Sequence, residues 1–155
     1  MKKVSGLLFL FLLLVSTSAF AQSQFRGSAK FVCGRADSTV IDAFAFAPGT
    51  YFTTINVGNP NAITVSGTKR FSIALVSQTP GKFTPLISWA LKPSESMQID
   101  CGDIYKRMLI PPGTFIDGFV QIVGSPSRFD VTAVHSVVDS DGRIVSLDIE
   151  EVTMR

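Results

Sequence analysis

The stretch Ile144-Val145-Ser146-Leu147-Asp148-Ile149-Glu150 carries the pattern that decides the fold of this 155-residue chain. Apolar and polar residues alternate along it, with Val145, Leu147 and Ile149 on one side of an extended backbone and Ser146, Asp148 and Glu150 on the other. Strict alternation has the period of a β-strand. It is typical of an antiparallel sheet that keeps one face in water.

The same period recurs along most of the chain, in short runs that are divided by Gly, Pro, Asn and Ser. Strands are predicted at residues 28–33, 40–46, 50–57, 62–66, 69–77, 84–91, 95–101, 116–124, 128–138 and 143–152. Turn-forming residues separate several of these runs, at Asn59-Pro60-Asn61, Thr79-Pro80-Gly81 and Ser140-Asp141-Gly142. The last turn should close a hairpin between the two final strands.

One short helix is predicted near residues 102–109. Asp103 could cap its first turn, and Ile104 and Met108 lie four residues apart, as neighbours on one helix face do. Pro111-Pro112-Gly113 would end it.

Many short strands between turns predict a mostly β chain that folds as a single-domain antiparallel β-sandwich of immunoglobulin-like type. Trp89 would be a core aromatic of this sandwich. A barrel is the alternative that the strand pattern leaves open.

Residues 1–21 have the three parts of a secretion signal. Lys2 and Lys3 are followed by an apolar run and then by small residues, with Ala19 and Ala21 at the −3 and −1 positions of a cleavage site before Gln22. A membrane anchor would need about 20 apolar residues, and this run is about half as long. We therefore expect a signal peptide, a flexible lead-in at residues 22–28 and a β-sandwich domain at residues 29–155.

Charge excludes one class of partner. Of the 14 Lys and Arg residues, Lys2 and Lys3 lie in the predicted leader, so 12 basic residues would remain against 12 Asp and Glu. A neutral chain lacks the basic face that neutralises phosphates, and we expect no nucleic-acid partner. No later stretch is apolar and long enough to span a bilayer, so no membrane span is expected after processing.

Cys33 and Cys101 are predicted to form a disulfide. An exported chain leaves the reducing cytoplasm, where a pair of cysteines would stay free. Each cysteine also falls on the apolar side of an alternating run, next to Phe31 in one case and Ile99 in the other. The alternative, a redox or metal-binding pair, prefers close spacing such as C-x-x-C.

Five segments resemble a family of small exported bacterial proteins of unassigned function. They are Ala29-Lys30-Phe31-Val32-Cys33-Gly34, Tyr51-Phe52-Thr53-Thr54-Ile55-Asn56-Val57-Gly58-Asn59-Pro60, Ile99-Asp100-Cys101-Gly102-Asp103-Ile104, Phe115-Ile116-Asp117-Gly118-Phe119-Val120-Gln121-Ile122 and Asp130-Val131-Thr132-Ala133-Val134. The resemblance spans residues 29–152. It supplies no mechanism.

The resemblance implies that Cys33 and Cys101 belong to a common pattern, which favours their pairing, and that Asn59-Pro60 marks the end of a strand. The chain departs from the pattern at Gly58, where the family is expected to have a histidine, and at His135, where a tyrosine is expected.

Candidate catalytic groups are few. His135 is the single histidine, which excludes zinc sites that need several histidines, and no serine lies in a G-x-S-x-G motif. His135 shares a mostly apolar strand face with Phe129, Val131, Ala133 and Val137, which favours a half-buried structural role over a ligand or pH-sensing role.

Three further patterns have structural explanations beside functional ones. Asp139-Ser140-Asp141-Gly142 resembles the start of a calcium loop, but the strand-like run after it favours a hairpin turn. Asp100 and Asp103 could form a carboxylate pair, or cap a helix. Alternating aromatics could form an exposed binding strip or fill the core: Tyr51, Phe52, Phe71, Phe83, Trp89, Phe115, Phe119 and Phe129.

The resulting hypothesis is an exported, non-enzymatic protein of the periplasm or the extracellular space that binds an unknown protein or envelope partner. No cofactor and no metal are expected, and the oligomeric state is left open. The alternative is a small exported hydrolase or metal-dependent protein that uses His135 and nearby carboxylates.

Overall fold

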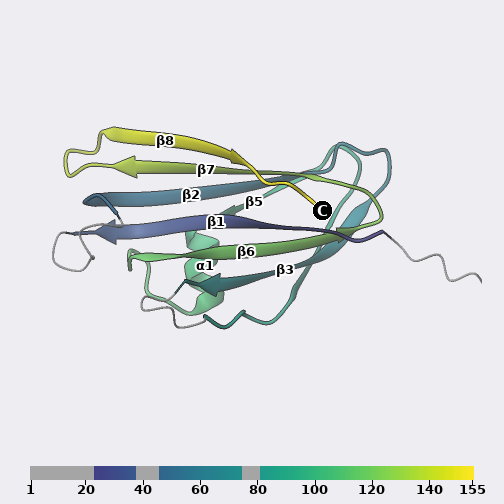
Figure 1. The fold of residues 1–155 in the computed structure, drawn as a ribbon, viewed down its shortest axis with the longest axis horizontal. Coiled ribbons are helices and arrows are strands. Elements are labelled where there is room, and N and C mark those ends of the chain that lie inside the picture. The colour runs from purple at the N-terminus through teal and green to yellow at the C-terminus, as the bar shows by residue number, and fades with distance from the viewer. Residues whose placement is uncertain (1–22, 38–45, 75–80) are drawn as a thin grey trace, which may run out of the picture.

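The computed structural model describes residues 23–37, 46–74 and 81–155. The predicted signal peptide, its cleavage residues Ala19 and Ala21 and the following Gln22 lie outside the described residues, as does almost all of the strand predicted at residues 40–46. In Figure 1 the strands run along the long axis of the molecule, and one helix lies behind them.

The chain is mostly β, as predicted. Its elements are β1 (Phe25–Ala36), β2 (Gly49–Gly58), β3 (Val65–Ile73), β4 (Ile87–Leu91), β5 (Ser96–Asp100), α1 (Cys101–Met108), β6 (Ile116–Ser125), β7 (Asp130–Val138) and β8 (Ile144–Glu151). All strand pairs are antiparallel.

The strands form two layers that share β1. The order along the sheet is β4-β3-β6-β1-β2-β7-β8, with β5 paired to β2 beside this path. Residues 25–33 of β1 pair with β6, whereas residues 34–36 pair with β2. The core between the layers takes side chains from both, including Phe31 and Phe71 from one and Ile55 and Ala133 from the other. This arrangement confirms the predicted single-domain antiparallel β-sandwich.

Gly34 makes the crossing of β1 possible. Its φ is +93°, in the region that glycine adopts freely and other residues avoid. A Cβ atom at Gly34 would also collide with the carbonyl of Thr114.

Two strand boundaries differ from the predictions. The lead-in expected at residues 22–28 is wrong for residues 25–28, because they pair with residues 121–124 of β6 and the backbone of Arg26 exchanges hydrogen bonds with Arg155. The strands expected at 62–66 and 69–77 are one strand, β3. Gly67 looks like a break in the sequence, but a Cβ there would overlap the Val123 carbonyl, so this glycine allows close pairing with β6.

The helix lies where it was expected, but its cap is another residue. Asp100 is the N-cap, and its carboxylate accepts the backbone N–H of Asp103 at 2.9 Å. Asp103 is therefore the donor of the capping hydrogen bond rather than the cap. Ile104 and Tyr105 are buried and hold α1 against the core.

A disulfide joins Cys33 of β1 to Cys101, the first residue of α1. It therefore links a strand to a helix, although both cysteines were predicted in strands. Closing a loop of this length stabilises the fold by roughly 4 kcal/mol in the chain-entropy model.

Candidate functional site

The first candidate site is the fork where β1 separates from β2. The two strands pair at Gly34–Ala36, and towards the N-terminus of β1 they diverge. At the fork the Thr53 hydroxyl of β2 takes the place of a neighbouring strand: it accepts the Val32 N–H and donates to the Val32 carbonyl, both at 2.9 Å. The Thr53 N–H donates to Sγ of Cys101 at 3.2 Å, so the fork lies directly beside the disulfide.

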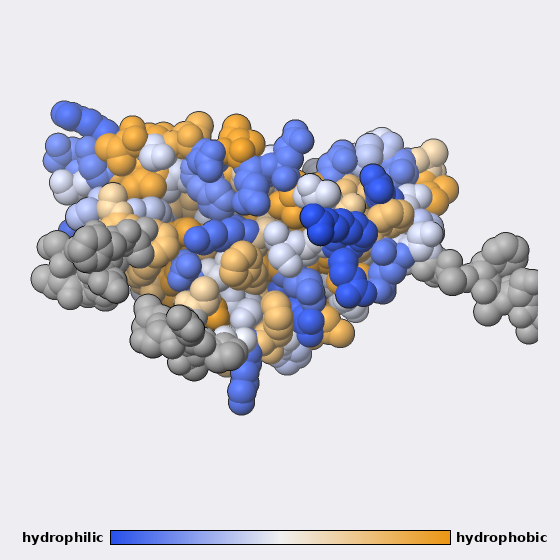
Figure 2. Space-filling model, viewed as in Figure 1, coloured by the Kyte–Doolittle hydropathy of each residue, from blue (hydrophilic) through white to orange (hydrophobic). Residues whose placement is uncertain are grey.

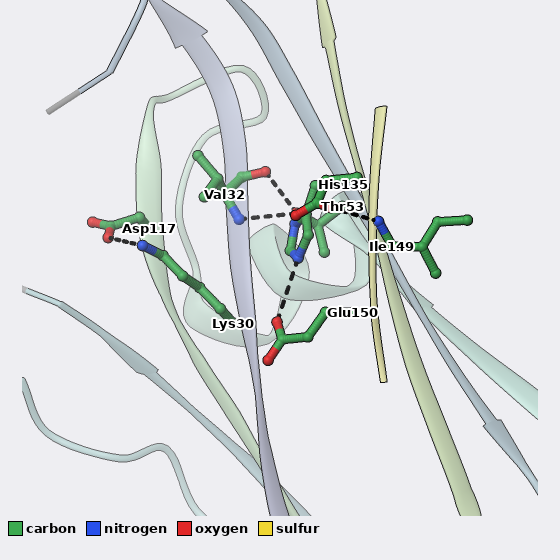
Figure 3. A network of polar contacts seen from close by, with 8 residues as sticks. Lys30, Val32, Thr53, Asp117, His135, Ile149 and Glu150 are labelled. Carbon is green, nitrogen blue, oxygen red and sulfur yellow. Dashed lines mark hydrogen bonds and ion pairs between the residues drawn. The ribbon is translucent and has the colours of Figure 1, made fainter. Parts of the chain in front are cut away.

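His135 of β7 completes this network (Figure 3). Its Nδ1 lies 3.0 Å from the Thr53 hydroxyl oxygen. The single hydroxyl proton of Thr53 is already donated to Val32, so His135 must be the donor and carry its proton on Nδ1. In the neutral imidazole, Nε2 is then an unprotonated acceptor.

Glu150 of β8 approaches the other ring nitrogen. The distance from its Oε2 to Nε2 of His135 is 3.9 Å, and the His135 side chain is 20% exposed. Asp148 stands directly opposite His135 in the β7–β8 register. The polar side of β8 therefore brings two carboxylates to the strand that carries the histidine, as the hydrolase alternative requires.

The chemistry of the fork nevertheless favours a structural role. Thr53 is 1% exposed, so no substrate reaches its hydroxyl. Its proton and both of its acceptor positions are occupied by Val32 and His135, and activation as a nucleophile would break the bonds that hold β1. Within the described parts of the chain, no three His, Cys, Asp or Glu residues gather in a way that could hold a metal ion.

Sequence reasoning placed His135 correctly on a mostly apolar face but missed Thr53. A signal was present: Thr53 lies on the same face of β2 as Ile55 and Val57, so the pattern places a hydroxyl among core residues. A buried hydroxyl needs partners, and the unpaired edge of β1 provides them.

An ion pair and an open groove flank the fork. Lys30 Nζ lies 3.9 Å from Oδ2 of Asp117, and burial raises the pKa of the Asp117 carboxyl although Lys30 partly opposes this. The groove, of about 420 Å³, runs between β1 and the C-terminal segment and is lined by residues that include Arg26, Glu150 and Arg155. Its mixed charges point to no single class of ligand.

The second candidate site is β8, the edge strand of its layer. All eight residues of β8 are exposed. An apolar side of the strand is solvated, with Ile144, Leu147 and Ile149 exposed by 68%, 62% and 62%. The alternation correctly predicted two faces from Ser146 onwards, with the polar side turned towards His135. It was wrong at Val145, where a β-bulge leaves this residue without a partner in β7 and sets Ile144 opposite Val138.

The apolar side of β8 continues across the sheet. Leu147 is in register with Ser136 of β7 and Phe52 of β2, and Ile149 with Val134. Residues directly opposite in a sheet share a face, so Phe52, which is 48% exposed, extends the same apolar surface. In Figure 2 hydrophobic side chains gather along the edge where Figure 1 places β8. We call Phe52, Val134, Ile144, Leu147 and Ile149 the β8 strip.

The remaining sequence candidates have structural roles. The carboxylate of Asp139 accepts the N–H groups of Asp141 and Arg143 within the turn that joins β7 to β8, which confirms the predicted hairpin. Most of the candidate aromatics are buried or half-buried. The exposed ones, Phe52, Phe83 and Phe119, lie on different elements and form no continuous strip.

Comparisons with known proteins leave the function open. No protein-family model matches the chain, and no curated protein matches it. A solved structure described as "Crystal Structure of Thermotoga maritima 1070" is similar with a TM-score of 0.49 and 8% sequence identity, over 84% of this chain and 91% of that chain. A similarity at this level carries no argument about activity. None of the described helical residues forms a helix long and apolar enough to cross a membrane.

Proposed function

We propose that the chain is an exported, non-enzymatic interaction module, and that β8 binds an extended segment of a partner protein as an additional strand. The observation that carries this proposal is an edge strand of eight exposed residues whose apolar side faces solvent. Long apolar edge strands attract other strands, and proteins that do not use them usually shorten, cover or charge them. Addition of a strand to such an edge is a common mode of peptide recognition.

The exported location is supported by the Cys33–Cys101 disulfide, because structural disulfides persist where thiols are oxidised. The periplasm and the extracellular space both meet this condition.

The non-enzymatic part is supported by the fork. The hydrolase alternative would use His135, but the hydroxyl beside it is buried and fully hydrogen-bonded. His135→Ala should therefore leave any binding activity of β8 in place. Loss of a hydrolytic activity in this variant would restore the alternative.

Cross-linking from β8 tests the binding surface. The chain from Gln22 onwards, with a photo-reactive amino acid in place of Leu147, is incubated with an extract of the cell envelope and irradiated. Leu86 is the matched control position, because it is also 62% exposed and lies outside β8, in the segment before β4.

The proposal predicts a cross-linked protein from position 147 that is absent from position 86 and is lost when Ile149→Lys is added. Equal cross-linking from both positions, or none from position 147, contradicts it.

A further inference from the structure

We infer that the segment received by β8 is β8 of a second copy of this chain, paired antiparallel with Leu147 on the two-fold axis. This inference rests on the proposed function and names its partner. It follows from the direction of the backbone groups on β8 and from the order of its charges.

The free backbone groups of β8 belong to Leu147 and Ile149, and to Ile144 on the other side of a β-bulge. At this bulge Val145 has no partner in β7, and the Arg143 carbonyl accepts the Asp139 N–H, so Arg143 faces the hairpin and Ile144 faces away from it. The Ile149 N–H donates to the carboxylate of Asp148 at 3.0 Å rather than to β7, so it points to the free edge. Backbone groups alternate in direction along a strand, and Leu147 therefore points the same way. An antiparallel partner can form a ladder only if its own edge-facing residues stand opposite these.

Among the registers that meet this condition, the one centred on Leu147 is self-complementary. It places Leu147 opposite Leu147 and Ile144 opposite Ile149, because Ile144 and Ile149 lie two β7 positions to either side of Leu147, so exposed apolar side chains gain apolar neighbours. Ser146 stands opposite Asp148 on the other face, where its hydroxyl can donate to the carboxylate.

The ends of the strand agree with this register. It brings Arg143, in the turn before β8, to the level of Glu150 of the other copy, at both ends of the interface. Opposite charges thus lie at the rim, where they favour the correct orientation.

The neighbouring registers are opposed by charge. A shift of two residues in one direction centres the pair on Asp148 and sets two carboxylates opposite each other. The shift in the other direction centres the pair on Ser146 and brings Glu150 to the turn that carries Asp139 and Asp141. Parallel pairing would align Asp148, Glu150 and Glu151 of one copy with the same residues of the other. Like charges directly opposite in a sheet are destabilising.

The dimer would be a continuous sheet across two molecules. A two-fold axis perpendicular to the sheet keeps both β8 strips on the same face. In the dimer the Ile149 N–H donates to a backbone carbonyl of the second copy instead of to the Asp148 carboxylate. One strand on each side gives a small interface, so we expect a dissociation constant on the order of 1–100 µM.

Sedimentation of the chain from Gln22 onwards across this concentration range tests the association. We expect reversible dimers. Leu147→Lys places two positive charges at the axis and should weaken dimerisation by more than about tenfold. Leu86→Lys, which changes an equally exposed leucine elsewhere, should leave it unchanged. Equal weakening in both variants, or dimers that persist in Leu147→Lys, overturns the inference.

Cysteine cross-linking tests the register, with the native disulfide intact. Leu147→Cys should form an intermolecular disulfide with itself, since directly opposite Cα atoms in a hydrogen-bonded pair are about 5.5 Å apart, within the range of a disulfide. Ile149→Cys should form one with Ile144→Cys in a mixture but not with itself. Rapid self-linking of Ile149→Cys overturns the register.

The two proposals fail differently. A chain that stays monomeric while position 147 still cross-links to another envelope protein overturns the inference and supports the proposed function. A monomeric chain without any such cross-link contradicts both.

Discussion

Strands β1 and β8 have the same alternating pattern and opposite environments. The apolar positions of β1, Ala29, Phe31 and Cys33, are completely buried, whereas Leu147 and Ile149 of β8 are exposed. The difference comes from position in the sheet. β1 lies between β6 and β2 and belongs to both layers, while β8 pairs with β7 on one side and with none of the described strands on the other. Alternation therefore determines that a strand has two different faces, but its place in the sheet determines which face is covered.

The backbones of the two strands differ in the same way. Where β1 loses its neighbouring strand, the Thr53 hydroxyl pairs with both backbone groups of Val32. On β8 the Ile149 N–H donates to the carboxylate of the adjacent Asp148 and not to another strand. A side chain from another strand closes the edge of β1, whereas the edge of β8 remains available.

The largest expected effect is the difference in stability between two alanine substitutions, one in each strand. Phe31→Ala removes a fully buried ring and should lower the free energy of unfolding by about 3–5 kcal/mol. Ile149→Ala removes an exposed side chain and should change it by less than about 0.5 kcal/mol. Urea unfolding checks both, at protein concentrations below the onset of dimerisation, because association would add stability by mass action. A loss in Ile149→Ala close to that of Phe31→Ala would mean that the β8 strip is covered within the monomer.

Much of this fold could be predicted from local sequence. Period-two alternation gave the mostly β class, the Ser140-Asp141-Gly142 turn gave the last hairpin, and Asn59-Pro60 gave the end of β2. These features depend on residues close together in the chain. The inward position of Cys33 also followed from its own strand.

The fork could not be predicted, because it joins residues far apart in sequence. Thr53 reaches Val32 across 21 positions and His135 across 82. No local pattern indicates that β1 changes partners at Gly34, so its unpaired edge was not expected. The exposed apolar face of β8 was missed for a related reason. Which face of this strand is covered depends on the side chains of β7 and β2, which are distant in the sequence.

The next effect concerns the hydroxyl that closes the edge of β1. Thr53→Val keeps the shape of the side chain but leaves the backbone groups of Val32 and Nδ1 of His135 without their partner. Buried unpaired groups should lower the free energy of unfolding by roughly 2–3 kcal/mol.

Thr53→Ser is the matched control, since it keeps the hydroxyl and removes one methyl group, at a cost of about 1 kcal/mol or less. Thermal or urea unfolding distinguishes the two variants. Equal losses would show that packing, rather than hydrogen bonding, holds β1 at the fork.

The smallest expected effect is a pH dependence on the other side of β1, where Asp117 of β6 stands in register with Val32. Burial raises the pKa of Asp117, and the Lys30 ammonium at 3.9 Å lowers it in part. A carboxyl whose pKa is raised by folding binds more protons in the folded state, so its contribution to stability is present at low pH and is lost as the pH rises through that pKa.

Asp117→Asn cannot ionise, so its stability relative to the wild type should increase between about pH 4 and pH 7, by less than about 1 kcal/mol because the site is partly solvated. Lys30→Gln should act in the opposite direction. Without the ammonium the pKa of Asp117 rises further, and stability should fall more steeply with pH than in the wild type. Urea midpoints across this range measure both slopes. Parallel pH profiles for the three proteins would show that the polar side of β1 is as well solvated as that of β8, and the contrast between the two strands would then be confined to their apolar faces.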